Sequence, residues 1–257
     1  MQKDFLHLLK EIEEKVRVVK EDIKKYASAS EVTIVAVTKS ASIDQILAVL
    51  SLGIVDIAEN RIPQFLSRKS MIECLALNRD PPTEQKIVEN PSPDALTAYR
   101  KAGFPRPVWH FIGPLHKSHA NKVVGECALI HSVDSLALAE RISRVAKIKG
   151  IVQDVLLEVN ISGEEQKHGF NAERLYETAP ALAALEGISI KGLMTMAPFT
   201  PDTAIQASVF RGLKELSLRL ENKGYNWSYL SMGMSNDYIE ALKAGATHIR
   251  IGTALFE

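Results

Sequence analysis

The sequence has few of the features that mark secreted, membrane or metal-binding proteins. Only two cysteines, Cys74 and Cys127, occur among 257 residues, and they match neither a metal-ligand spacing nor a disulfide framework. No apolar stretch approaches the roughly 20 residues of a membrane span, and residues 1–5 hold no apolar signal core. We therefore expect a reducing, cytoplasmic location, with no membrane partner and no metal site.

Neither sign of charge dominates. Thirty-one Lys and Arg residues balance thirty-one Asp and Glu residues, so the chain as a whole gives no reason to expect a nucleic acid partner. The sequence also lacks a Gly-x-Ser-x-Gly nucleophile elbow and a Walker phosphate loop. His116 and His119 are three apart and could share a helix face, but no Cys or carboxylate completes a metal set there.

Strands and helices alternate along the chain. Apolar, β-branched runs predict strands near residues 32–38, 54–58, 108–112, 128–132, 152–159, 188–194, 227–231 and 247–252. Apolar residues at helical spacing predict an amphipathic N-terminal helix and seven further helices, over residues 2–27, 42–52, 62–70, 116–124, 135–148, 171–185, 202–222 and 236–244. Four residues suit helix ends: Ser42 and Asp134 as N-caps, Gly53 and Gly245 as C-caps.

This alternation is typical of an α/β fold, a single (β/α)8 TIM barrel. We predict one domain over residues 1–257 with an extra N-terminal helix, and a doubly wound open sheet is the alternative. Residues 71–107 interrupt the alternation, because they are polar, contain six prolines and are too long for a barrel loop. We expect an insertion there with one short helix over 94–102, serving as a lid or as a passive surface loop.

Lys39 ends the first apolar run, residues 33–38. Barrels place functional groups at the C-terminal ends of their strands, and a lysine there can form a Schiff base with an aldehyde. The alternative is a lysine that ends a strand and points into water.

Small residues end the last two predicted strands. Gly233 and Gly252 expose backbone N–H groups near the helix that follows Ser235, and Ser231 and Thr253 add hydroxyl groups. Barrels commonly bind a phosphate at this position, although such glycines also serve tight turns.

Arg250 lies on the last strand, beside this predicted phosphate site. A lysine and a phosphate site together suggest an aldehyde phosphate, and pyridoxal 5′-phosphate (PLP) is the obvious candidate. Many PLP sites set an acidic residue against the pyridine nitrogen. Arginine cannot give up its proton, so Arg250 would keep that nitrogen unprotonated; a phosphate contact and a surface ion pair are the alternatives.

Eight ordered segments carry a family resemblance: residues 35–39, 59–60, 109–113, 131–136, 159–165, 192–196, 230–235 and 249–256. In these segments the chain resembles the pyridoxal phosphate homeostasis proteins, which are similar to the N-terminal barrel of alanine racemase, the fold-type III PLP architecture. So many ordered matches are highly specific. The resemblance implies PLP as the cofactor and the following residues as its site: Lys39 for the Schiff base, Ser231, Gly252 and Thr253 for the phosphate with N–H groups near Met232 and Gly233, Arg250 for the pyridine nitrogen, and Asn60 beside the ring.

The chain also departs from the family pattern. Ala58 replaces the usual glycine before Glu59 and Asn60, and residues 113–122 form a longer segment after the third strand than the family has. Glu257 stands where glycine is common, and the insertion at 71–107 is not typical. These departures put the contacts of the loop after the third strand in doubt.

The family resemblance implies a carrier more than a catalyst. The sequence ends six residues beyond Ile251, so we expect no second domain of the kind that supplies the tyrosine base of alanine racemase. A racemase needs an acid or base on each face of the substrate, and Lys39 serves only one. We therefore expect a monomer or weak dimer that buffers PLP and delivers it to apo PLP-dependent enzymes; a weak racemase or lyase and a scaffold that has lost PLP are the alternatives.

Overall fold

The described residues form a closed barrel of eight parallel strands, each paired with its neighbours in chain order. The computed structural model describes residues 5–77, 79, 90–103, 105–164 and 168–257. The strands are β1 (Thr33–Val37), β2 (Asp56–Glu59), β3 (Val108–Phe111), β4 (Leu129–Val133), β5 (Gln153–Glu158), β6 (Ile188–Met194), β7 (Tyr229–Met234) and β8 (His248–Ile251). The barrel closes between β8 and β1, where Val35 is opposite Arg250. The predicted TIM barrel is confirmed.

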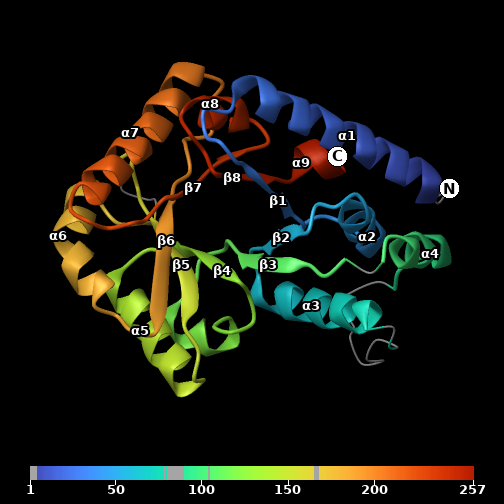
Figure 1. The fold of residues 1–257 in the computed structure, drawn as a ribbon, viewed down its shortest axis with the longest axis horizontal. Helices are drawn as coiled ribbons and strands as arrows, with labels where there is room; N and C mark the ends of the chain where they lie inside the picture. The colour runs from blue at the N-terminus through green and yellow to red at the C-terminus, as the bar shows by residue number, and fades with distance from the viewer. Residues whose placement is uncertain (1–4, 78, 80–89, 104, 165–167) are drawn as a thin grey trace.

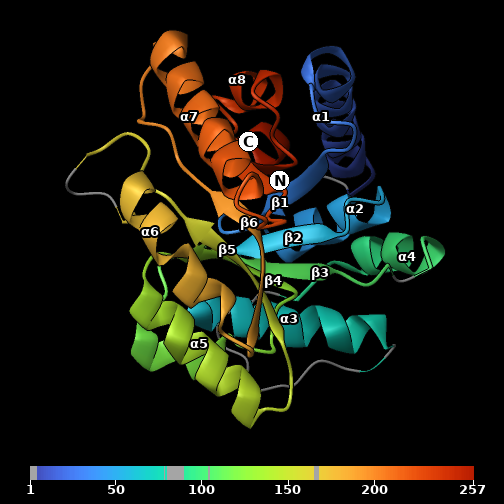
Figure 2. The same cartoon turned by 60° about the vertical axis from the view of Figure 1, so that its left-hand side comes forward.

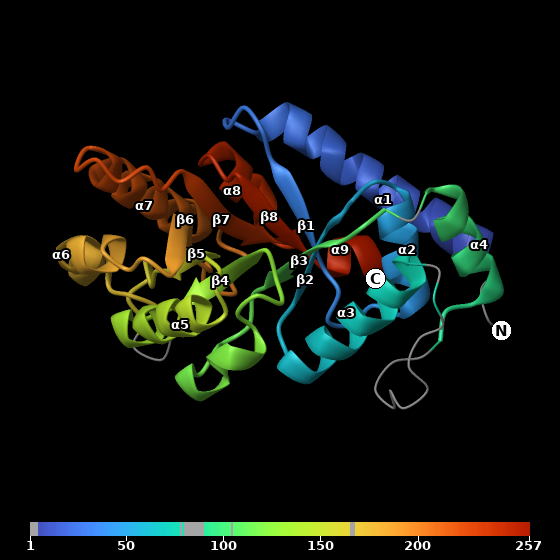
Figure 3. The same cartoon turned by 60° about the horizontal axis from the view of Figure 1, so that its bottom comes forward.

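Helices cover the outside of the barrel (Figure 1). They are α1 (Phe5–Tyr26), α2 (Ile43–Ser51), α3 (Ile62–Ala76), α4 (Pro93–Lys101), the 3-10 helix η1 (Lys117–Lys122), α5 (Leu136–Ile148), α6 (Ala172–Ala183), α7 (Thr203–Glu221), α8 (Tyr238–Lys243) and α9 (Thr253–Phe256). Helices α5 and α6 lie together on one side, opposite α2 and α4 (Figure 2). The long α1 packs outside this ring against α2, α8 and α9, which brings the C-terminal helix beside the N-terminal one (Figure 3).

Strand residues alternate between two environments, as the two-residue period of a strand requires. On β8, Ile249 and Ile251 belong to the large apolar core between strands and helices, whereas His248 and Arg250 do not. The barrel interior holds two small apolar clusters, Val35, Val37 and Ala58 in one and Leu129, Leu156 and Met194 in the other. Buried polar side chains therefore occupy much of the interior.

Several predicted helix ends are confirmed and two are corrected. Ser42 caps α2 through a hydrogen bond from the Gln45 backbone N–H, and Gly53 and Gly245 follow their helices with positive φ angles. Asp134 is not the N-cap of α5, because Ser135 accepts the capping N–H from Leu138 instead. The predicted helix over 116–124 is a shorter 3-10 turn.

The predicted insertion at 71–107 is corrected at its start. Residues 71–76 continue α3, which is six residues longer than the predicted helix over 62–70. The short helix predicted inside the insertion is α4, which packs against α2 as part of the outer layer. Residues 80–89 lie outside the described residues, so the choice between lid and passive loop is untested.

Candidate functional site at the barrel mouth

Lys39 follows β1 in an exposed turn at the C-terminal end of the barrel. The turn begins at Thr38, whose carbonyl oxygen accepts a hydrogen bond from the Ala41 N–H at 2.9 Å. Arg250 comes from the adjacent strand, and its partner across the ladder is Val35, four residues before Lys39. The two cations predicted for the site therefore come from neighbouring strands that open at the same end.

The C-terminal end of the barrel is its mouth, and Arg250 is a buried cation there, with only 3% of its surface exposed. It donates to the Ser231 hydroxyl at 2.7 Å and to the Thr195 carbonyl oxygen at 3.0 Å. Burial lowers the pKa of Arg250 to about 10, while the charges of Asp237 and Glu158 oppose that shift. The guanidinium therefore stays charged at neutral pH. A guanidinium has five N–H donors, so further donors remain for a ligand.

A chain of hydrogen bonds runs from Arg250 through the barrel interior. The Ser231 hydroxyl lies 2.9 Å from His131 Nδ1, His131 Nε2 lies 2.9 Å from His110 Nδ1, and His110 Nε2 lies 3.0 Å from Asp56 Oδ1. Burial, with His110 and Arg250 nearby, lowers the pKa of His131 well below its ordinary value, so this imidazole is neutral. His110 is thus a hydrogen-bonded interior histidine. We name this series, from Arg250 to Asp56, the interior chain.

Ser231 is part of the interior chain, and its predicted phosphate contact stays untested. Its surface is fully buried, and its hydroxyl already joins Arg250 to His131. Ser235 lies at the mouth instead, where its Oγ accepts the N–H groups of Gly252 and Ala254, each at 3.2 Å. Ser235 is the hydroxyl that the sequence argument missed, although it stood in the same motif.

The other predicted phosphate residues divide between the mouth and the core. The Met232 side chain is fully buried in the core outside the barrel. Gly233 has φ +91, and a Cβ there would lie 2.6 Å from the Ala241 Cβ, so this position requires glycine. Gly252 and Thr253 begin α9 beside Ser235. Among the described residues, Gly252 and Thr253 after β8 and Ser235 after β7 therefore present polar groups at the mouth.

Asn60 follows β2 and is held by a close backbone approach. A Cβ on Gly113 would lie 1.9 Å from the Asn60 carbonyl oxygen, so only glycine allows the two segments to touch. The Gly113 carbonyl oxygen in turn accepts the Ser132 hydroxyl at 2.5 Å. The Asn60 Oδ1 atom is buried and has no hydrogen-bond partner among the described residues. A buried oxygen without a partner is costly in a protein alone, and a donor group on a ligand would satisfy it.

Glu158 is an acidic residue of the mouth to which the sequence assigned no role. It ends β5, is 6% exposed, and lines a cavity of about 180 Å³ with His168, Asn160, Ile112, Pro114, Val159 and Met196. Burial first, and then the nearby Asp134 charge, raise the pKa of Glu158 to about 7, against the opposing charges of Arg250 and His168. Glu158 is therefore poised to gain or lose a proton near neutral pH.

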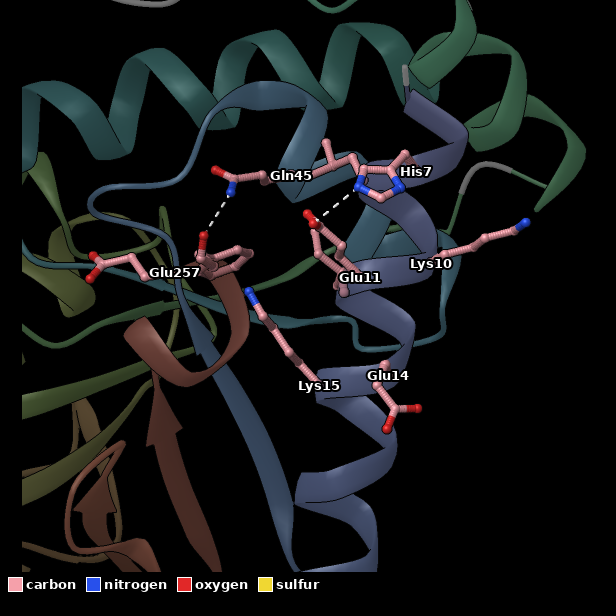
Figure 4. Close-up of a pocket in the computed structure, with 10 residues that line it drawn as sticks. His7, Lys10, Glu11, Glu14, Lys15, Gln45 and Glu257 are labelled. Carbon is pink, nitrogen blue, oxygen red and sulfur yellow. Dashed lines mark hydrogen bonds and ion pairs between the residues drawn. The ribbon is translucent and has the colours of Figure 1, made fainter. Parts of the chain in front are cut away.

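A second, larger cavity of about 720 Å³ lies on the outer side of the barrel, between α1, α2 and the last residues of the chain (Figure 4). His7 Nε2 of α1 lies 3.2 Å from Glu11 Oε1, and Gln45 donates to the Phe256 carbonyl oxygen at 3.0 Å. No residue of the predicted site lines this cavity.

In the part of the chain that the structure describes, no three His, Cys, Asp or Glu side chains group as metal ligands, and no helix is long and apolar enough to cross a membrane.

The family of the alanine racemase N-terminal domain matches residues 9–257 of the chain. The pyridoxal phosphate homeostasis protein of Synechocystis sp. is 36% identical over 226 residues, which are 88% of this chain and 90% of the relative. The chain belongs to the pyridoxal phosphate homeostasis protein family. The relative from Aquifex aeolicus has the same name and is 43% identical over 150 residues, 58% of this chain and 65% of the relative. The predicted family is confirmed, and these homeostasis relatives are not named as enzymes.

The chain is also similar to a solved structure that contains PLP. PipY of Synechococcus elongatus, solved with PLP bound, has a TM-score of 0.76 and 27% identity, covering 96% of this chain and all of PipY. Alanine racemase of Clostridium difficile has a TM-score of 0.66 at 16% identity, over 94% of this chain and 56% of the racemase. The racemase shows the shared barrel fold only, because the chains have diverged so far.

Proposed function

We propose that this homeostasis-family protein binds PLP at the barrel mouth through Lys39 and acts in intracellular PLP homeostasis. The likeness to PLP-bound PipY along its whole length carries the proposal. Three features of the chain support it: a lysine and a buried arginine from adjacent strands, hydroxyl and N–H groups at the start of α9, and a buried Asn60 oxygen without a partner in the described structure. When bound, PLP supplies an aldehyde that condenses reversibly with a lysine amine.

Each residue of the proposed site has a separate task. Lys39 supplies the amine, and Arg250 presents a permanent positive charge to the pyridine nitrogen and so keeps it unprotonated. Gly252 and Thr253 bind the phosphate together with Ser235, which takes the place of Ser231 in the proposed set. Asn60 would lie beside the ring, where its buried Oδ1 would accept a hydrogen bond from the ring hydroxyl group. Gly233 allows the turn that brings Ser235 to the mouth.

We further propose that the protein buffers PLP and delivers it to apo PLP-dependent enzymes, and is not a dedicated catalyst. The names of the curated relatives support this reading. A weak PLP-dependent activity is the second candidate, and Glu158 favours it, because a carboxyl group with a pKa of about 7 at the mouth suits general acid or base catalysis. Turnover of amino acids by the loaded protein, abolished in Glu158→Gln, would establish the second candidate in place of the first.

The lysine variant tests the proposed function. Lys39→Ala should abolish the visible absorption band that PLP gives with the wild-type protein, because no amine remains to take the aldehyde. Borohydride reduction followed by peptide mass spectrometry should place PLP on the peptide of Lys39 in the wild type. Lys147→Ala removes an exposed lysine at the end of α5 and should leave both results unchanged. A band of full strength in Lys39→Ala would exclude Lys39 as the PLP-binding lysine.

A further inference from the structure

The turn that carries Lys39 is tied to helix α3 as well as to the barrel. Arg68 of α3 donates from Nη1 to the carbonyl oxygen of Thr38 and from Nη2 to that of Ala41, the latter at 2.6 Å. These two carbonyl groups flank Lys39 on either side. One side chain therefore hydrogen-bonds to both ends of the turn from outside the barrel.

Glu59 holds Arg68 in that position. The Glu59 carboxylate forms an ion pair with Arg68 Nη1 and accepts the Thr38 hydroxyl on the same oxygen. The Thr38 hydroxyl also lies 3.2 Å from the Ala58 carbonyl oxygen, at the end of β2. Strand β2, helix α3 and the turn after β1 thus meet in one hydrogen-bonded group, the Arg68 clamp, formed by Arg68, Glu59, Thr38 and Ala41.

The burial of the clamp argues against a role in stability alone. The Glu59 side chain is fully buried and that of Arg68 is 12% exposed. A buried ion pair gives little net stability, because removing both charges from water costs about as much as their attraction returns. Its geometry is specific, since one planar guanidinium bonds a carboxylate and two carbonyl oxygens at once. We therefore expect this arrangement to fix the backbone of the turn more than it raises the free energy of unfolding.

We propose that Arg68, held by Glu59, is a positioning residue for Lys39. It fixes the backbone of residues 38–41 and so holds the base of the Lys39 side chain in the geometry needed to meet an aldehyde. This inference rests on the proposed function of Lys39, but the fixed turn is a property of the protein alone. Bond formation depends steeply on placement, and a displacement of about 1 Å can cost about a hundredfold in rate.

The first test measures the turn without PLP. Arg68→Met keeps an unbranched apolar stem and removes all three bonds, so amide hydrogen exchange in the peptide spanning residues 38–42 should become at least about tenfold faster. Lys69→Met is the matched control, because Lys69 is the next residue of α3, is 18% exposed and pairs with Glu73 and Glu126. The control should leave exchange in that peptide unchanged. Equal exchange in Arg68→Met and wild type would overturn the proposal.

The second test measures the reaction of Lys39 with PLP. The rate of appearance of the visible band should fall by about tenfold to a hundredfold in Arg68→Met. The variant leaves Glu59 buried without a counter-charge and is therefore less stable, so the rates are compared under conditions in which it stays folded. Arg68→Lys should recover only part of the rate, because the three donors of an ammonium group sit on one nitrogen and cannot span the acceptors that the two terminal nitrogens of Arg68 reach. A wild-type rate in Arg68→Met, or full recovery in Arg68→Lys, would refute a positioning role.

The two tests separate the two proposals. If wild-type protein forms no band with PLP while Arg68→Met still loosens the turn, the proposed function fails and the clamp stands as a feature of the fold. If the wild type forms the band and both Arg68 variants match it, the positioning role fails and the proposed function survives. Should Arg68→Met not fold, Arg68→Lys replaces it, since lysine keeps a positive charge beside Glu59 but cannot reach both carbonyl oxygens of the turn; a wild-type rate there would refute the positioning role.

Discussion

Glu158 shows how one buried side chain can make the barrel mouth sensitive to pH. Its carboxyl group is removed from water, with Asp134 as a neighbouring negative charge and Arg250 and His168 as opposing ones. The neutral form is favoured in the folded protein up to a pKa of about 7, against an ordinary value of 4.5. The folded state therefore retains a proton that the unfolded chain has already released between these two values.

This retained proton predicts how stability changes with pH. As pH rises from about 4.5 to about 7 the unfolded state releases the Glu158 proton first, so the free energy of unfolding falls. Glu158→Gln cannot ionise and should lack this loss, with an advantage over wild type that grows to on the order of 3 kcal/mol above pH 7. Urea denaturation across this window measures the difference. Glu13→Gln on exposed α1 should follow the wild type, and parallel curves for all three proteins would contradict the assigned pKa.

The predictable site residues are those at strand tips. Lys39 and Arg250 could be placed from sequence because apolar, β-branched runs lead directly to them. Ser231 was predicted at the tip of its strand, but β7 continues to Met234, three residues past its predicted end, which leaves Ser231 inside the barrel. Arg68 had no local signal, since its partner Glu59 lies nine residues away, across the turn from strand to helix. Ion pairs of this kind depend on packing that no local sequence pattern records.

At the scale of elements, the contact between the ends of β2 and β3 depends on one glycine. Gly113 lies so close to Asn60 that any side chain would overlap its carbonyl oxygen. The Ile112 N–H donates to the Glu59 carbonyl oxygen at 3.0 Å beside this contact. The absence of a side chain at position 113 therefore sets the distance between two loops of the mouth.

Gly113→Ala should destabilise the protein by more than about 3 kcal/mol, because the new methyl group must displace backbone and not a flexible side chain. Gly53→Ala is the comparison, since a Cβ there meets open space among the described residues and costs only a positive-φ strain of about 1 kcal/mol. Chemical denaturation of the two variants measures both losses. Similar losses would show that the end of β3 can move away from Asn60.

Element order was predictable, whereas element ends were less so. All eight strands were found where apolar, β-branched runs placed them. Helix α3 is longer than predicted, because Met71, Ile72 and Leu75 continue its buried face. These residues were assigned to the insertion on account of the prolines that follow them. The residues of η1 form a tighter turn than predicted, and His116 caps it by accepting the Ser118 N–H. Tertiary contacts decide such ends more than local preference does.

At the scale of the whole molecule, the polar barrel interior makes stability sensitive to acid. Burial lowers the pKa of His248 to about 4, with His110 contributing in the same direction, and that of His131 falls well below its ordinary value. As pH falls from about 6.5 to about 4, His248 takes up a proton in the unfolded chain but stays neutral in the folded protein. The free energy of unfolding therefore decreases over this range.

His248→Gln should reduce this fall in the free energy of unfolding at acid pH, here called the acid limb. Glutamine does not titrate, so the variant should lose less stability than wild type between about pH 6.5 and pH 4, by on the order of 3 kcal/mol at the acid end. His7→Gln on exposed α1 is the control and should leave the limb unchanged. Thermal or urea unfolding at several pH values gives the comparison. An acid limb of equal slope in His248→Gln and wild type would show that His248 accepts a proton in the folded state.

The interior chain determines how protons can move through the barrel. Asp56 accepts from His110, so with neutral imidazoles each member donates to the next, from Arg250 through Ser231 and His131 to His110. Every donor points away from the mouth. Carrying a proton upward would require the hydroxyl and both rings to reverse together while Arg250 keeps its own protons. The floor of the barrel is therefore closed to proton transfer, and a ligand beside Arg250 would exchange protons with groups at the mouth and with solvent, not through the interior chain.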